Sequence, residues 1–447
     1  MTRLSFCNLI LLLWLIVFSS VGYADTAEPY GTDEDFAVHV ADEATLNYRT
    51  AFDWLLSPND DSSIFGARSS WRGNIAINYR YFCHEGLYPD QPHSDTSLII
   101  EPEYSLTWPD GHVLVFAPYL QLDDQDHERS HFDLREFYFM WVSDTFELSC
   151  GFKKIFWGVT ESQNLVDIIN QSDFIARGDS SDKLGQPMVN LTLLQDWGTV
   201  DLFVMPYFRE QIFAGKHGRL RPSIPIDADR AEYEDSDKEK HIDYAIRYSH
   251  YLGELEFGLS YFNGTAREPE IIGADYVMLP QGPVPTALIP YYFQVEQTGL
   301  DLQYILDSWL LKAEIVNRNT EKDNYNAWTV GFEYTFTGIL NTETDLSILG
   351  EWLYDSRNDD STSPYNNDIM AGTRLAFNDT NNSEITVNVI KDLDYSATVL
   401  NIEATRRLTD HLSVDFDLYW CWEDEPHDVF YPLRNDDLIS CKLAYYF

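Results

Sequence analysis

The stretch that decides the fold is Trp71 to Tyr81, with the sequence WRGNIAINYRY. Its odd-numbered positions are mostly large and apolar, whereas its even-numbered positions are arginine, asparagine and alanine. Successive side chains of a β-strand point to opposite faces, so this segment has one apolar face and one polar face. A second segment of the same kind, Leu412 to Trp422 (LSVDFDLYWCW), lies near the end of the chain. Both segments predict strands that separate an apolar environment from a wet one.

The connections between such segments alternate in length along the chain. Short turns such as Trp108–Gly111 are followed by longer polar connections such as Glu210–Lys240. A soluble β-sandwich has no reason to sort its loops onto two ends, whereas a transmembrane barrel has short periplasmic turns and long extracellular loops. The pattern predicts an all-β fold, a transmembrane antiparallel β-barrel of about 18 strands over residues 70–447, with about 16 strands as the alternative.

The strands are expected to begin near Trp71, Ser97, His112, Phe132, Thr145, Met188, Thr199, His241, Glu254, Tyr291, Trp309, Tyr325, Thr344, Asp368, Ser383, Tyr395, His411 and Asp437.

Residues 1–24 have the layout of a secretory signal peptide. Arg3 precedes an apolar run from Leu9 to Phe18, and small residues lead to an expected cleavage point after Ala24. The run is short for a helix that crosses a bilayer of about 30 Å, which favours a cleaved signal over an uncleaved anchor. A cleaved signal followed by a barrel predicts the outer membrane of a Gram-negative bacterium. Residues 25–69 are expected to form an N-terminal periplasmic extension.

Composition excludes several classes of protein. The chain of 447 residues carries 30 basic and 73 acidic side chains, and this excess of acid argues against nucleic acid as a partner. Its 12 Trp, 28 Tyr and 26 Phe residues supply too much apolar surface for a disordered chain. No zinc signature or nucleotide-binding glycine loop occurs, so no cofactor, metal or catalytic residue is expected.

The cysteines show no metal or redox spacing. In their strands Cys441 shares the apolar face, which we expect to contact lipid, whereas Cys421 shares the polar face. The two thiols are therefore not expected to pair.

The polar faces of the strands carry many ionisable side chains, which cannot be buried dry without partners. A barrel of this size is wide enough to hold water. The long connection Trp157–Pro187 is expected to fold into the lumen as a constriction, with an external cap as the alternative. Candidate lining and constriction residues are Arg135, Lys153, Glu161, Asp167, Asn170, Asp173, Arg247, Glu314, Glu351, Arg374, Arg407, Asp415 and Asp417.

Two segments resemble known families of outer-membrane proteins. The hairpin that contains Leu134–Tyr138 and Gly151–Gly158 resembles one in porin-like families, including alginate-export-type barrels. The resemblance implies a polyanion carrier for the latter, but the acidic polar face here departs from a basic lumen. The last strand resembles the closing strand of Gram-negative outer-membrane proteins, which implies that Tyr445 and Phe447 belong to the signal read by the barrel-insertion machinery.

The function expected from these features is passive, porin-like diffusion of small hydrophilic solutes, cationic or neutral, through an acidic water-filled lumen. The alternative is a loop-closed structural or binding barrel at the cell surface. A barrel hydrolase is a third reading, with Ser249-His250 and the pair His241 and Asp243 as its only candidates, and no enzyme is expected. Expected partners are outer-membrane lipid, lipopolysaccharide, the insertion machinery and further copies of the chain.

Overall fold

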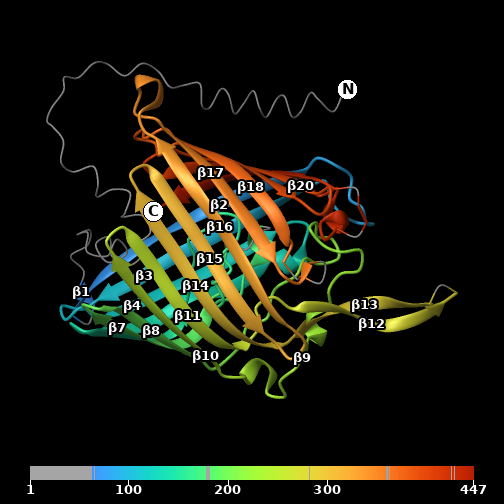
Figure 1. Ribbon diagram of the computed structural model, residues 1–447, viewed down its shortest axis with the longest axis horizontal. Helices are drawn as coiled ribbons and strands as arrows, with labels where there is room; N and C mark the ends of the chain where they lie inside the picture. Colours follow the sequence, from blue (N-terminus) through green and yellow to red (C-terminus); the bar gives the residue numbers. More distant parts are fainter. Residues whose placement is uncertain are drawn as a thin grey trace. The chain divides into compact units, whose positions relative to one another are not determined.

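The computed structural model describes residues 63–64, 66–177, 182–280, 282–358, 361, 363–423, 425–426 and 428–447. They form a closed antiparallel β-barrel of 18 strands (Figure 1). The barrel strands are β2 (Ala67–Phe82), β3 (Ser94–Thr107), β4 (Val113–Asp123), β5 (His131–Val142), β6 (Phe146–Lys153), β7 (Gln186–Gln195), β8 (Gly198–Met205), β10 (Asp243–Leu252), β11 (Leu255–Thr265), β14 (Gln294–Leu306), β15 (Trp309–Asn319), β16 (Asn324–Phe336), β17 (Asp345–Asp355), β18 (Asn367–Ala376), β19 (Glu384–Asp392), β20 (Thr398–Thr409), β21 (Leu412–Trp422) and β22 (Leu438–Tyr446).

The remaining elements are short or lie outside the barrel wall. β1 (Ser63–Ile64) pairs with the start of β2. The helical turns are η2 (His127–Arg129), α3 (Phe174–Arg177), η3 (Ala228–Arg230), η4 (Lys238–Lys240), η5 (Ile339–Asn341) and η7 (Tyr431–Leu433). No helix in the described part of the chain is long and apolar enough to cross a membrane.

The barrel closes between its first and last strands. β2 pairs with β3 on one side and with β22 on the other, where Ala76 lies opposite Ala444. Gly73 and Phe447 complete the closure, since the amide of each donates to the carbonyl of the other at 3.1 and 3.0 Å. Closure leaves no unpaired strand edge in the wall, which is the condition for a sheet to cross hydrocarbon.

The predicted fold class and strand count are confirmed. Each predicted strand is present, and the barrel starts slightly earlier than residue 70, because β2 begins at Ala67. The predicted signal peptide (residues 1–24) and the extension as far as residue 62 lie outside the described residues.

The two faces of each strand are separated as the alternating pattern predicts. In β2, Trp71 and Ile77 are 59% and 54% exposed on the outer face, whereas Asn78 and Arg80 are buried inside the barrel. The same outward exposure of large apolar side chains recurs around the wall, at Trp141, Tyr244, Leu259, Trp309, Trp352 and Leu443 among others. An outward apolar surface of this kind is typical of a barrel in contact with lipid.

Cys441 is exposed on the outer face and Cys421 is buried. Both are free thiols, as are Cys83 and Cys150.

One long connection has structure that the sequence did not indicate. β12 (Glu270–Leu279) and β13 (Gly282–Tyr292) form a hairpin that projects from the barrel, and β9 (Glu232–Tyr233) pairs with β13 in parallel (Figure 1). The sequence predicted a loop over most of this segment. Pro283, Pro285 and Pro290 weaken the strand signal there. β13 is the middle strand of this small sheet, but β9 pairs only with Tyr291 and Tyr292, so the prolines lie outside the stretch that pairs with β9.

Candidate functional site: a loop inside the barrel

The connection between β6 and β7 folds into the barrel over its described residues, 154–177 and 182–185; we call these residues the inner loop. Its apolar residues Trp157, Leu165, Val166, Ile168 and Ile169 belong to a buried cluster. The wall contributes the inward-facing side chains of β7, β8, β10, β11 and β14–β16, namely Met188, Phe203, Met205, Ala245, Phe262, Val295, Val316 and Ala327. The apolar side of the inner loop therefore packs on one half of the wall.

Glu314 of β15 binds the backbone of the inner loop from the facing wall. Its Oε1 accepts hydrogen bonds from the amides of Val159 and Thr160 at 2.7 and 3.1 Å and from Thr160 Oγ1 at 2.8 Å. Its Oε2 accepts from the amide of Val166 at 3.2 Å. The side chain is fully buried. A carboxylate that accepts several backbone N–H groups in a dry site is a strong anchor for the loop.

Glu351 of β17 binds the tip of the inner loop in the same way. It accepts hydrogen bonds from the amides of Glu161 and Ser162 at 2.8 and 2.9 Å and from Ser162 Oγ at 2.5 Å. The loop leaves the wall at β6 and reaches β15 and β17, which lie on the other side of the ring of strands. The inner loop therefore crosses the interior, and two wall carboxylates hold its far end.

A cluster of four charged side chains surrounds the loop tip. Glu161 accepts from Lys312 Nζ at 3.0 Å and from Arg374 at 2.9 Å. Glu333 lies 3.3 Å from Arg374 and 3.7 Å from Lys312. About a quarter of the side chains of Glu161 and Arg374 is exposed, at 26% and 25%, so this cluster borders open space.

Asp167, Asn170 and Asp173 were expected to line the opening, but they brace the base of the loop instead. Asp173 pairs with Arg135 at 2.5 Å and with His131 at 2.9 Å. Asp167 pairs with Lys183 at 3.2 Å, and Asn170 donates to the carbonyls of Lys153 and Leu184. All three side chains are buried because their partners lie within the loop or in the wall beneath it.

The other predicted lining residues divide between the two halves of the barrel. On the half that the inner loop covers, Arg247 pairs with Asp301 at 2.6 Å and Lys153 donates to Asn190 at 3.1 Å. On the other half, Arg407 is exposed, and Asp415 accepts from Thr405 at 2.7 Å. Asp417 lies two residues beyond Asp415 on the same face of β21, opposite Ser440 of β22.

Sequence reasoning missed several residues that hold the long loops in place. Arg267 donates to Asp243 at 2.8 Å and to the carbonyl of Ile169 at 2.9 Å, which links the inner loop to the wall. Arg219 lies in residues 206–242, which we call the mouth loop. Its Nε donates to Asp436 at 2.6 Å, and its other nitrogens donate to carbonyls of the first and last long loops, including Asn435 at 2.6 Å and Pro92 at 2.9 Å. The mouth loop thus reaches across the long-loop end of the barrel.

The candidate hydrolase residues do not assemble into a catalytic group. Ser249 and His250 are consecutive in β10 and point to opposite faces, and His250 lies beside the rings of Tyr248 and Phe257. His241 contacts Asp243 at 2.9 Å, but Asp243 is also the partner of Arg267. Among the described residues no group of His, Cys, Asp and Glu has the arrangement of a metal site.

Acidic side chains gather at the long-loop end between β18, β19 and the last loop. Burial, together with the neighbouring carboxyls of Glu423 and Asp392, raises the pKa of Asp428 to about 7. The folded protein therefore holds this proton more tightly than the unfolded chain, and the free energy of unfolding should fall as pH rises from about 4 to about 7.

If the barrel conducts ions, the same titration should change its ion selectivity. Below pH 7 Asp428 becomes neutral, so the mouth attracts cations less strongly. We expect the reversal potential under a salt gradient to shift toward zero between about pH 8 and about pH 6. In Asp428→Asn this pH-dependent shift of the reversal potential should be smaller. An unchanged shift in the variant would show that another group titrates.

The closed wall, the outward apolar surface and the interior loop define a transmembrane β-barrel of porin-like architecture. Neither a family model nor a curated protein sequence matches the chain. Among solved structures, OmpT, an outer membrane protein of Vibrio cholerae in its trimer form, is 10% identical with a TM-score of 0.42, over 86% of this chain and 100% of that one. A triple mutant of the Rhodopseudomonas blastica porin is 12% identical with a TM-score of 0.41, over 85% of this chain and 100% of that one. Because these identities and TM-scores are low, the assignment to this class of barrel rests on the features of this structure and not on the two compared structures.

Proposed function

We propose that the chain is a porin-like channel of the Gram-negative outer membrane, exported through a cleaved signal peptide, through which small hydrophilic solutes, cationic or neutral, diffuse passively. The observation that carries the proposal is the exposure of charged side chains inside the barrel. Glu403 and Arg407 face inward on β20 and are exposed. Their charges require water, because an unpaired charge in a dry interior is costly. The half of the lumen that the inner loop leaves uncovered is then the passage.

The preference for cations follows from the balance of charge along this passage. The inward side chains of β2, β3 and β18–β22 that are at least partly exposed include more acids than bases. The acids are Glu101, Glu103, Glu384, Glu403, Asp415 and Asp417, and the bases are Arg68, Arg72, Arg374, Arg407 and Lys442. The acids at the outer end add to this excess. A water-filled passage with an acidic wall concentrates cations and repels anions.

Planar-bilayer recording tests the proposal directly. The full-length protein, purified in detergent, should form stable conducting steps, and its reversal potential under a potassium chloride gradient should have the sign of cation preference. A reversal potential of the opposite sign would contradict the charge assignment. An absence of conductance, combined with an absence of sugar uptake by proteoliposomes, would contradict the channel.

A second candidate function, a binding barrel closed by its loops, is favoured by the mouth loop. The guanidinium of Arg219 is buried and joins this loop to the first and last long loops. The amide of Gly215 also donates to Asp126 at 3.0 Å. These contacts hold the mouth loop over the outer end of the lumen, where it limits access.

Arg219→Ala separates the two functions. Loss of one partner of a buried ion pair costs about 3–5 kcal/mol, so the mouth loop should detach from Asp436. If the barrel is a channel, the wild type should conduct and Arg219→Ala should conduct moderately more. If Arg219→Ala conducts and the wild type does not, the wild type is the closed binding barrel. Arg230→Ala is the matched control, because Arg230 lies in the same loop and its ion pair with Asp275 is exposed and contributes little.

A further inference from the structure

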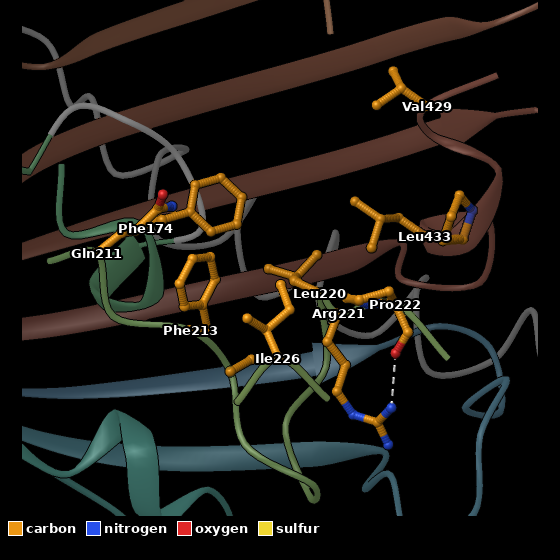
Figure 2. A pocket seen from close by; sticks show the side chains of 11 residues that line it. Phe174, Gln211, Phe213, Leu220, Arg221, Pro222, Ile226, Val429 and Leu433 are labelled. Carbon is orange, nitrogen blue, oxygen red and sulfur yellow. Dashed lines mark hydrogen bonds between the residues drawn. The ribbon is translucent and has the colours of Figure 1, made fainter. Parts of the chain in front are cut away.

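A cavity of about 260 Å³ lies among the outer loops (Figure 2). Three segments that are distant in sequence supply its walls: α3 of the inner loop, the mouth loop and the last long loop. Most of the lining is apolar, with Phe174, Phe213, Leu220, Ile226, Val429 and Leu433 as its main side chains. In Figure 2 the rings of Phe174 and Phe213 lie at the left, Leu220 and Ile226 of the mouth loop in the centre, and Val429 and Leu433 of the last long loop at the right.

Leu220 is held in this cavity by a backbone conformation that a leucine rarely adopts. Its φ is +58°, in the left-handed region. The carboxylate of Asp436 imposes this conformation, since it accepts the amide of Leu220 at 3.0 Å and Nε of Arg219 at 2.6 Å. A strained bulky residue persists where the surroundings fix it, and such positions cluster at binding sites.

The polar groups of the lining identify the chemistry of a ligand. Arg221 is occupied, since it donates to the carbonyls of Lys216, Pro222 and Ser223, and its guanidinium points away from the apolar side chains (Figure 2). Gln211 also lines the cavity, and its side-chain amide makes no hydrogen bond to any residue that the structure describes. The cavity therefore offers apolar walls and one uncharged hydrogen-bonding group.

We propose that this cavity binds a small uncharged compound with one six-membered ring, whose ring packs among Phe174, Phe213 and Leu220 and whose polar substituent bonds to Gln211. An apolar cavity of roughly 150 Å³ holds benzene, so the larger cavity here has room for a ring and a substituent. The charged group of the lining, the guanidinium of Arg221, points away from the apolar side chains, which disfavours ions. The site goes beyond the proposed channel, because binding at the mouth needs no passage through the lumen.

The test is binding of 4-fluorobenzyl alcohol, which has one six-membered ring and one hydroxyl, to the full-length protein in detergent, followed by ¹⁹F relaxation. Empty micelles supply the blank for partition of the probe into detergent. We expect saturable binding. Val429→Trp fills the cavity from its exposed edge and should weaken binding by about tenfold or more. Gln211→Leu keeps the apolar walls and should weaken it by about three- to tenfold through loss of one hydrogen bond.

Leu340→Trp is the matched control, because Leu340 is 88% exposed in a turn at the other end of the barrel. It should bind the probe as the wild type does. Broadening that does not saturate, or equal binding by Val429→Trp and Leu340→Trp, would overturn the site. Unchanged binding by Gln211→Leu would overturn the assigned hydrogen bond. The assay needs no conductance, so its outcome is independent of the channel experiment.

Discussion

Glu314→Ala is expected to raise single-channel conductance severalfold and to make the open current noisy. The substitution removes the acceptor for three backbone amides and one hydroxyl of the inner loop. Each hydrogen bond to a charged group contributes about 1.5–3 kcal/mol, and a buried donor left without a partner costs further free energy. The loop should therefore leave the far wall and uncover the half of the lumen that it fills.

Glu256→Ala is the matched control for this prediction. Glu256 also faces inward, on β11, but its hydrogen-bond partner is Tyr251 of the neighbouring strand rather than the inner loop. The conductance of Glu256→Ala should stay near that of the wild type. Resistance of the folded barrel to unfolding in detergent, measured on a gel with and without heating, checks that both variants are folded. Equal conductance in both would show that the inner loop does not limit the current.

Reversal of three carboxylates on the uncovered half is expected to convert cation preference into anion preference. Glu403→Lys, Asp415→Lys and Asp417→Lys combined change the local charge by six units without touching the inner loop. These side chains lie on the adjacent strands β20 and β21, where Glu403 is opposite Asp417. The permeability ratio of cation to anion should fall by about tenfold or more, and the reversal potential should change sign.

Arg407→Glu is the opposite change on the same strand. It should strengthen cation preference, because Arg407 is an exposed base on this side of the lumen. A high-salt recording should reduce both effects, since the Debye length falls to about 3 Å at about 1 M salt. If neither variant moved the reversal potential, the ions would have to pass elsewhere.

The wall of the barrel could be predicted from the sequence because each strand meets lipid on one face and a polar interior on the other. β2 and β21 carry this division at every second residue. The alternation predicted which face of each strand is apolar, and it placed Cys421 and Cys441 on opposite faces. The alternating lengths of the connections predicted the number of strands. The alternation of side chains between the two faces breaks where the register between two paired strands changes. A bulge between Ala117 and Pro118 shifts the pairing of β4 with β5, where Arg135 is buried and the adjacent Glu136 is half-buried.

The loops could be predicted only in outline. The apolar residues of the inner loop indicated that it would grip the wall, but nothing in the sequence paired Asp173 with Arg135 or Asp167 with Lys183. These partners lie outside any periodic pattern. Because of these ion pairs, Asp173 and Asp167 are buried and stabilise the base of the loop, although they were expected to line the lumen. Arg219 is the extreme case, since Asp436 lies 217 residues away in the chain. Contacts of this range depend on how the closed barrel brings its loops together.

Cysteine scanning of β20 tests the central claim most directly. In a background without the native cysteines, single cysteines at Leu400, Asn401, Ile402, Glu403, Ala404 and Thr405 would be labelled in proteoliposomes. A charged, membrane-impermeant maleimide should react at Asn401, Glu403 and Thr405. Cysteines at Leu400, Ile402 and Ala404 should stay unlabelled in the folded barrel and react only after denaturation, because a thiol in hydrocarbon stays protonated and only the thiolate reacts. Strict alternation would show water inside the barrel and hydrocarbon outside it. Equal labelling of all six positions by the charged reagent would contradict the account.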